Sequence, residues 1–310
     1  MGLHKKFRGT VVPMVTPFGS DLSVDTESNV RLIRWIVCAG AHPFLFGTTG
    51  ESSSLSENQK EVALQSAVQE VAGRSMVYAG VSANCLEDSI RTAKKFADIG
   101  ANAVVAHVPF YFPMDGYQAM NYFEKLAERS PLPLILYNMP ATTRFSIPLE
   151  VVEKLSDHPN IGGIKDSERD EVRMIHLIHF CRERSDFSYL LGWTACSYMA
   201  LTLGADGIVP STGNIFPDWY VELAEAIERG EQEKAHKLQE LTDEVTLLYQ
   251  EKRQLNHSIP ALKMILAEMG LCQPWVMPPL YRMGKAEEEE YRQEVSIRLK
   301  MMMERKRNEC

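Results

Sequence analysis

The 310-residue chain is 45% hydrophobic and 24% charged and has a formal net charge of −8, which indicates a folded chain with a large core and excludes a disordered or fibrous one. The acidic balance disfavours nucleic acid and anionic lipid as partners, since both carry phosphate charge. No apolar run reaches the roughly 20 residues of a membrane helix. With six scattered cysteines and no apolar signal segment in its first residues, the chain fits a cytoplasmic protein.

Short β-rich apolar runs alternate with longer amphipathic stretches up to about residue 230. This pattern predicts strands at 8–15, 42–47, 75–81, 101–108, 132–138, 160–166, 187–193 and 205–211. It predicts helices at 24–40, 56–73, 85–100, 115–130, 146–156, 168–184, 195–204 and 216–230. Ser56 and Gln59 have capping-box spacing. Glycines stand where helices should stop, at Gly40, Gly73, Gly100, Gly204 and Gly230.

Buried strands that each lead into a crossover helix fit either a closed (β/α)8 barrel or an open doubly wound sheet. Eight such units favour the barrel, so we expect an α/β fold with a catalytic barrel domain at 1–230. Only helices are predicted afterwards, at 231–254, 258–270 and 285–307. We expect 231–310 to form a C-terminal helical region packed on the barrel. Its MMM run could face a membrane, but the flanking Glu and Arg favour a solvated or subunit-packing helix.

The active site of such a barrel lies where the strands end in loops, which makes Lys165 in GGIKDS the first candidate. A partly desolvated ammonium has a lowered pKa, so its free amine can attack a carbonyl carbon and form a Schiff base. The alternative is a structural lysine paired with the adjacent Asp166. The neighbouring strand should help to decide between them.

Tyr137 ends the preceding strand, and adjacent strands lie roughly 5 Å apart, so its phenol can reach Lys165. There it could move protons during catalysis, although a strand-end tyrosine can also be a core residue whose hydroxyl lies in water.

The turn GTTGE, residues 47–51, contributes exposed backbone amides and the hydroxyls of Thr48 and Thr49. Such a turn can hold a small anion, a carboxylate or a phosphate. An ordinary loop is the equally supported alternative.

Other classes of chemistry lack their motifs. The chain contains no P-loop, no GxGxxG after its first strand, no HExxH and no GxSxG, so we expect no nucleotide, no metal, no cofactor and no serine-hydrolase triad. His107 ends the fourth predicted strand, where packing is a better-supported role than catalysis.

Together, GTTGE at 47–51, YNxP at 137–140 and GIKDS at 163–167 resemble the motifs of the dihydrodipicolinate synthase and N-acetylneuraminate lyase family. The resemblance covers nearly the whole chain and implies a Schiff-base class I aldolase on a TIM barrel. It implies catalytic roles for Lys165, Tyr137, Thr48 and Tyr111, the last donated across a subunit interface. A homo-oligomer, either a dimer or a tetramer, follows from that role.

The resemblance also implies a small-molecule substrate, a 2-keto acid such as pyruvate, together with an aldehyde or the aldol adduct of the two. The substrate-binding residues that it implies are Gly47, Thr48, Thr49, Thr142, Ser167, Gly192 and Ile208. Thr142 stands where the synthase branch has an arginine for the carboxylate of its aldehyde substrate, and Arg144 is two residues away. After Gly192 the chain reads Trp-Thr-Ala, where the sialic-acid lyases have acidic residues.

The motif Lys-Asp-Ser at 165–167 is closer to that of branches acting on 2-keto-3-deoxy sugar acids and related keto acids. We therefore predict a 2-keto-acid lyase or aldolase of that kind. The alternatives are a dihydrodipicolinate synthase that condenses pyruvate with aspartate semialdehyde, an N-acetylneuraminate lyase, and a silent barrel that binds a keto acid without turning it over.

Overall fold

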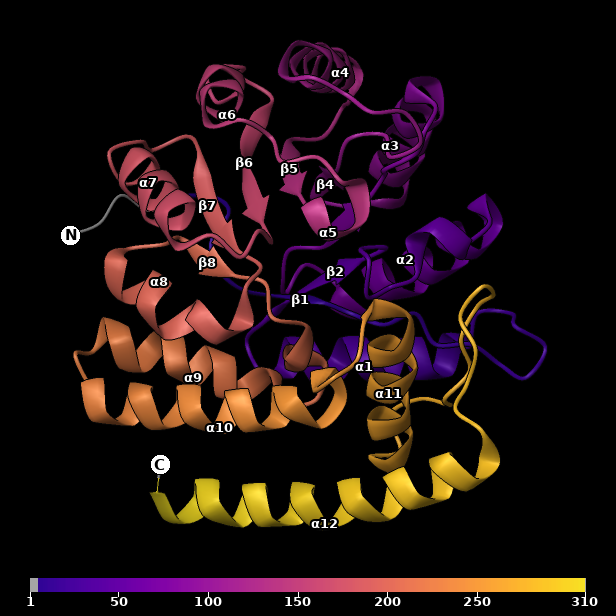
Figure 1. Cartoon of the computed structure of the whole chain (residues 1–310). Coiled ribbons are helices and arrows are strands. Elements are labelled where there is room, and N and C mark those ends of the chain that lie inside the picture. The colour runs from indigo at the N-terminus through magenta and orange to yellow at the C-terminus, as the bar shows by residue number, and fades with distance from the viewer. Residues whose placement is uncertain (1–4, 310) are drawn as a thin grey trace.

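Parallel strands form a closed barrel at the centre of the molecule in the computed structural model, which describes residues 5–309 (Figure 1). Each strand pairs with the next one in the chain, and β1 closes the ring against β8. The strands are β1 (Gly9–Pro13), β2 (His42–Leu45), β3 (Tyr78–Gly80), β4 (Ala103–Ala106), β5 (Leu134–Asn138), β6 (Ile161–Asp166), β7 (Ser188–Leu191) and β8 (Gly207–Ile208). The predicted (β/α)8 barrel is confirmed.

Helices surround the barrel as an outer layer (Figure 1). Those that alternate with the strands are α1 (Thr26–Cys38), α2 (Glu57–Val71), α3 (Leu86–Ile99), α4 (Gly116–Arg129), α5 (Pro140–Thr143), α6 (Leu149–Leu155), α7 (Glu171–Arg182), α8 (Ser197–Leu203) and α9 (Pro217–Glu228). Short 3-10 turns occur at η1 (Ser52–Ser54), η2 (Thr194–Cys196) and η3 (Ser211–Asn214). The predicted capping box of α2 is confirmed. The Ser56 side chain accepts a hydrogen bond from the backbone N–H of Gln59, and the Gln59 side chain accepts one from the backbone N–H of Ser56.

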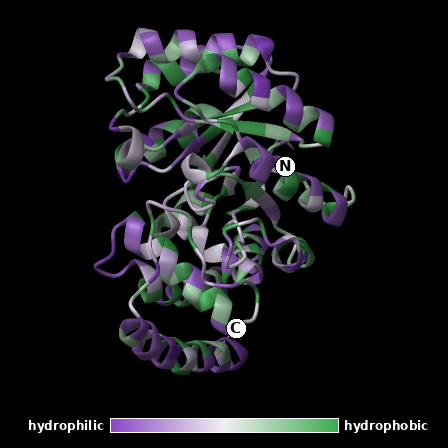
Figure 2. Cartoon of the chain, turned by 90° about the vertical axis from the view of Figure 1, so that its right-hand side faces the viewer, coloured by the Kyte–Doolittle hydropathy of each residue, from purple (hydrophilic) through white to green (hydrophobic). Residues whose placement is uncertain are grey.

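The strands are buried on both faces, because one face lines the barrel and the other packs under the helices. Side chains inside the barrel form an inner cluster of Phe7, Val11, Phe44, Tyr78, Ala103, Val105, Ile135, Tyr137, Leu190 and Val209. A larger outer cluster lies between the strands and the helices. Figure 2 shows the corresponding pattern, with hydrophilic residues along the outward faces of the helices. Successive residues of one strand therefore enter two different environments.

Two predicted elements differ from the structure. The helix predicted at 146–156 is shorter, and α5 precedes it as a separate turn that ends at Arg144, whose φ of 56° is left-handed. The strand predicted at 205–211 contains only β8, because Pro210 has no N–H for the ladder and η3 begins directly after it.

Three helices follow the barrel: α10 (Gln232–Gln250), α11 (Leu255–Glu268) and α12 (Lys285–Glu309). Tyr291 Oη of α12 donates to Leu248 O of α10 at 2.9 Å, and α12 lies across α10 and α11 (Figure 1). In the MMM run Met302 is 5% exposed and Met301 63%, so this helix packs through one side. The domain division at residue 230 stays a prediction, and residues 1–4 and 310 of its two ranges lie outside the described residues.

Candidate active site

Lys165 is the fifth residue of β6, and strand alternation turns its side chain into the barrel. Its Nζ atom lies 4.0 Å from the centroid of the Tyr137 ring and 4.9 Å from that of the Phe44 ring. Tyr137 is also its register partner on β5. The residue is 5% exposed, so its amine is largely removed from water at the end of the barrel where the loops begin.

Asp166, the next residue, faces the opposite way. Its Oδ2 accepts a hydrogen bond of 2.6 Å from Arg173 Nε on α7. Within residues 5–309, no carboxylate pairs with Lys165. The alternative of a structural lysine paired with Asp166 is therefore wrong. Burial lowers the pKa of Lys165, and the nearby Tyr137 acts in the opposite direction.

Tyr137 and Thr48 are in contact although Tyr137 lies on β5 and Thr48 in the turn after β2, and these two strands are not neighbours. Tyr137 Oη and Thr48 Oγ1 are 3.2 Å apart, and either oxygen can donate the hydrogen bond. Tyr137 is 4% exposed, and its ring lies edge-on to Phe44 with centroids 6.5 Å apart. Its hydroxyl is thus held by Thr48, which contradicts the alternative of a core tyrosine with its hydroxyl in water. A hydroxyl pair beside an amine can transfer protons.

The turn after β2 carries Thr48 to this position. Gly50 N–H donates to Gly47 O at 3.1 Å, and Thr16 Oγ1 donates to Gly50 O at 2.8 Å. In the described part of the chain, the amide N–H groups of Thr48 and Thr49 have no hydrogen-bond partner. Both residues are half-buried. Free amides in a tight turn can bind a small anion, and this one lies next to Tyr137.

Ser167 and Gly192 lie against each other beyond the ends of β6 and β7. A Cβ atom at Gly192 would lie 2.1 Å from Ser167 Oγ, so a larger residue does not fit there without a shift. Ile208 points away from them, because its side chain belongs to the outer cluster whereas Val209 belongs to the inner one. A contact between Ile208 and substrate therefore has to use its backbone.

Thr142 and Tyr111 are apart from the other predicted site residues. Thr142 is exposed on α5, where its hydroxyl donates to Met139 O at 3.3 Å. Tyr111 is 74% exposed between β4 and α4, and its N–H donates to Asn84 Oδ1 at 3.2 Å. A single chain thus brings Lys165, Tyr137 and Thr48 together. The roles of Thr142 and Tyr111 stay predictions.

Phe44 is a site neighbour that the sequence reasoning missed, although alternation along β2 places it inward two residues after His42. His107 is 9% exposed and its ring centroid lies 6.0 Å from that of Tyr137. Burial lowers the pKa of His107, which favours a neutral ring next to Lys165. Phe44 and His107 thus give the amine a wall without negative charge.

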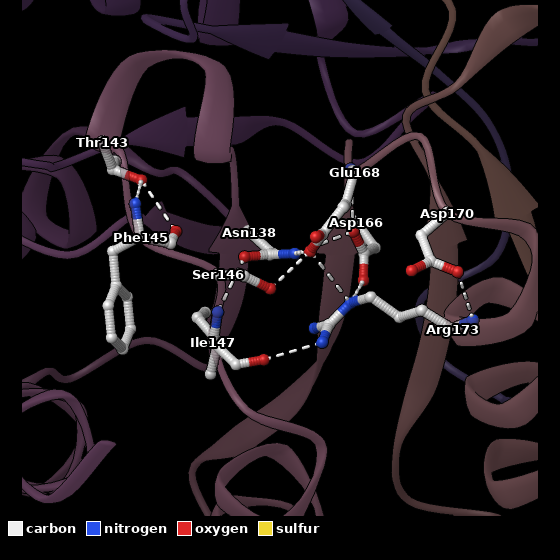
Figure 3. Close-up of polar contacts among 9 residues, drawn as sticks. All are labelled: Asn138, Thr143, Phe145, Ser146, Ile147, Asp166, Glu168, Asp170 and Arg173. Atoms are coloured by element: carbon white, nitrogen blue, oxygen red, sulfur yellow. Dashed lines mark hydrogen bonds and ion pairs between the residues drawn. The ribbon is translucent and has the colours of Figure 1, made fainter. Parts of the chain in front are cut away.

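A buried polar network lies behind β6 and joins the loops that follow β5 and β6 (Figure 3). Arg173 Nε contacts Asp166 Oδ2 at 2.6 Å and Glu168 Oε2 at 3.4 Å. Asn138 Nδ2 donates to the same two carboxylates, at 3.0 and 2.9 Å. Ser146 Oγ donates to Glu168 Oε2 at 2.5 Å. The sequence shows charged residues here but gives no sign that they meet.

Breaking this network should be costly. We expect Arg173→Met to lower the free energy of unfolding by about 3 to 5 kcal/mol, because Asp166 would remain buried without its cation. Urea unfolding measures the change. Arg184 is a suitable control, since its partners Asp157 and Asp186 are 76% and 65% exposed, and Arg184→Met should cost about 1 kcal/mol or less. Equal losses in both variants would contradict this account of the network.

Among residues 5–309, no three or more His, Cys, Asp or Glu side chains are grouped so that they could hold a metal ion. None of the helices in that range has the length and hydropathy needed to cross a membrane.

A (β/α)8 barrel with a buried lysine facing a tyrosine at the ends of its strands has the architecture of a barrel enzyme with its active site at that end. The model of the dihydrodipicolinate synthetase family matches residues 6–300, and the chain belongs to this family. It is 33% identical over 233 residues to a 4-hydroxy-tetrahydrodipicolinate synthase of Thermodesulfovibrio yellowstonii, covering 75% of this chain and 79% of that protein.

Solved structures give the same result. The dihydrodipicolinate synthase of Bacteroides thetaiotaomicron superposes with a TM-score of 0.88 at 30% identity, covering 94% of this chain and 98% of the other. A prophage protein of the dihydrodipicolinic acid synthase family from E. coli K12, solved in complex with pyruvate, has a TM-score of 0.85 at 26% identity, covering 94% and 99%. The chain is accordingly a lyase of this family.

Proposed function

We propose that Lys165 forms a Schiff base with pyruvate or a related 2-keto acid and that the enzyme makes or breaks a carbon–carbon bond next to the imine. The buried amine, which faces Tyr137 and has no carboxylate partner within residues 5–309, carries this proposal. The neutral Nζ adds to the keto carbon, water leaves, and the resulting iminium withdraws electrons from the neighbouring carbon. Loss of a proton, or of an aldehyde, from that carbon then gives an enamine.

The surrounding residues divide the remaining tasks. The free amides of Thr48 and Thr49 would bind the carboxylate of the keto acid and orient its carbonyl toward Lys165. Tyr137, with its hydroxyl against Thr48 Oγ1 at 3.2 Å, would carry protons to and from the departing oxygen and the substrate. Ser167 and Gly192 lie next to Lys165 along the strand ends and would line the same pocket.

We favour a 2-keto-3-deoxy sugar acid, or a related keto acid, as the substrate or product. Thr142 is exposed on α5 and has a short uncharged side chain, so it offers no cation for the carboxylate of aspartate semialdehyde. This weakens the alternative of a dihydrodipicolinate synthase. A screen of pyruvate with sugar aldehydes and with aspartate semialdehyde, read out by pyruvate consumption, compares the two directly.

Borohydride reduction in the presence of pyruvate tests the proposal, because it traps the imine irreversibly. Intact mass and peptide mapping should place one adduct on Lys165. Failure to trap pyruvate or a larger 2-keto acid in folded protein would exclude the Schiff-base mechanism and favour a silent barrel that only binds keto acids.

The pH dependence of trapping should reflect the burial of Lys165. Only the neutral amine attacks, so the trapping rate should rise with pH and level off above the pKa of Lys165 in the folded protein. Because burial lowers that pKa, we expect the midpoint below the ordinary lysine pKa of 10.5. Trapping rates between about pH 6 and pH 11 measure it, and a midpoint at the ordinary lysine pKa would contradict the lowered pKa.

We further propose that two copies of the chain pair through the segment between β4 and α4, in line with the predicted dimer or tetramer. Phe110, Tyr111 and Phe112 of this segment are 43%, 74% and 75% exposed, and Tyr117 in the first turn of α4 is 71% exposed. Such a cluster of exposed aromatic side chains favours a protein interface. A two-fold pairing would let Tyr111 of each copy enter the site of the other.

A charge in this surface should separate the copies. We expect Phe112→Asp to shift the protein toward monomers in analytical ultracentrifugation and to lower turnover by roughly 10²-fold, the effect of losing one proton-transfer group. Tyr281 is 76% exposed between α11 and α12, so Tyr281→Asp serves as the control and should change neither. A monomeric wild type, or a monomeric variant with full activity, would contradict the pairing.

A further inference from the structure

A buried ion pair connects the turn that carries Thr48 to the helices after the barrel. Glu51 Oε1 lies 2.5 Å from Lys263 Nζ on α11, and their side chains are 1% and 0% exposed. Both ends have a second anchor in the segment before α12. Lys263 Nζ donates to Trp275 O at 2.8 Å, and Glu51 Oε2 accepts from the Met277 amide at 2.7 Å.

Burying such an ion pair costs free energy because both charges leave water, so its position needs an explanation. Burial raises the pKa of Glu51 and lowers that of Lys263, and each charge opposes the shift of the other. Two apolar residues would fill this space without removing charges from water. The pair does not contribute a group to the reaction, because Glu51 and Lys263 bind each other and the segment at 275–277 rather than Lys165 or Tyr137.

Glu51 also closes the turn with its own backbone. Its N–H donates to Thr48 O at 3.1 Å, and its φ of 57° is left-handed, a conformation that a residue with a side chain rarely adopts. Glu51 therefore binds α11 through its side chain and Thr48 through its backbone N–H. The carboxylate and the backbone amide of Glu51 constrain the turn together.

We propose that Glu51 and Lys263 are positioning residues for the keto-acid carboxylate, so that α11 completes the substrate site from outside the barrel. The pair keeps the amides of Thr48 and Thr49 pointing at the substrate and keeps Thr48 Oγ1 against Tyr137. The identity of the anion rests on the proposed function, whereas the constraint on the turn does not.

The test compares two buried lysines that have the same kind of partners. Lys263→Met removes the pair at the turn. Lys5→Met removes a pair at the other end of the barrel, where Lys5 Nζ binds Asp206 at 2.8 Å and donates to Cys181 O at 2.7 Å. For Lys263→Met we expect the pyruvate concentration for half-maximal borohydride trapping to rise roughly 10- to 100-fold. The maximal trapping rate should change less, about threefold, because Lys165 itself is untouched. Lys5→Met should leave both values unchanged.

Hydrogen exchange of the peptide covering 47–55 measures the turn independently of activity. It should exchange faster in Lys263→Met and at the wild-type rate in Lys5→Met. If Lys263→Met does not fold, Glu51→Gln replaces it, since the amide oxygen can still accept from Met277. If the wild type traps no keto acid, the proposed function fails. Hydrogen exchange of 47–55 alone then tests whether the ion pair constrains the turn. An unchanged turn and an unchanged pyruvate dependence would overturn the positioning role.

Discussion

Lys165→Ala should yield a protein that forms no imine with pyruvate and has no measurable lyase activity. Lys165→Arg should behave in the same way, because a guanidinium stays protonated and cannot attack a carbonyl. Intact mass after borohydride reduction reads out the loss directly. An adduct that survives in either variant would move the Schiff base to another lysine and contradict the role of Lys165.

The burial of Lys165 also affects the free energy of unfolding, and the direction of this effect follows from the pKa of its amine. Burial lowers the pKa of Lys165 in the folded state, so between that pKa and the unfolded value the unfolded chain binds more protons. Stability contributed by this residue therefore increases as the pH rises through that window and is reduced below it. We expect Lys165→Met to raise the melting temperature at neutral pH, as often happens when a strained functional residue is replaced. Calorimetry measures it, and a lower melting temperature would contradict the cost assigned to the buried amine.

Tyr137→Phe should reduce turnover by about 10² to 10⁴-fold while the protein stays folded. The phenyl ring keeps the contacts with Phe44 and His107 but loses the hydroxyl that Thr48 holds. Pyruvate should still be trapped on Lys165, only more slowly, because the amine remains in place.

Tyr78→Phe is the matched control. Tyr78 is 1% exposed and belongs to the same inner cluster, but its hydroxyl lies 3.9 Å from Met76 Sδ rather than near Thr48. We expect near-normal turnover from this variant. Near-normal turnover in Tyr137→Phe as well would exclude the proton-transfer role.

The features that could be predicted are those that depend on neighbours in sequence or on adjacent strands. Lys165 and Tyr137 end consecutive strands, so parallel pairing brings them into register, as Tyr137↔Lys165. The contact between Tyr137 and Thr48 depends on barrel closure, because β2 and β5 are not adjacent. The pairing of Glu51 with Lys263, more than 200 residues later, leaves no trace in local periodicity.

The ion-pair partner of Asp166 also could not be predicted from the sequence. In the sequence it is the closest carboxylate to Lys165, yet in a strand the next residue is on the opposite face. Arg173, seven positions further on, is its actual partner. Local proximity in a strand is therefore a poor guide to ion pairs, and the alternative based on it was wrong for that reason.

Lys165 and Asp166 face opposite sides of β6. The residue proposed for the chemistry is thereby separated from the residue that holds the loop after β5. We expect changes in the loop between Asn138 and Ile147 to alter what enters the site, while Asn138 binds both the carboxylate of Asp166 and the Ile147 N–H and so keeps the loop attached to β6. Under the proposed function, a lineage could thus exchange one second substrate for another without rebuilding its reaction chemistry. For protein engineering, libraries that diversify the exposed positions 141, 142 and 144 and retain Asn138, Asp166 and Arg173 should change substrate preference with the least loss of folded protein.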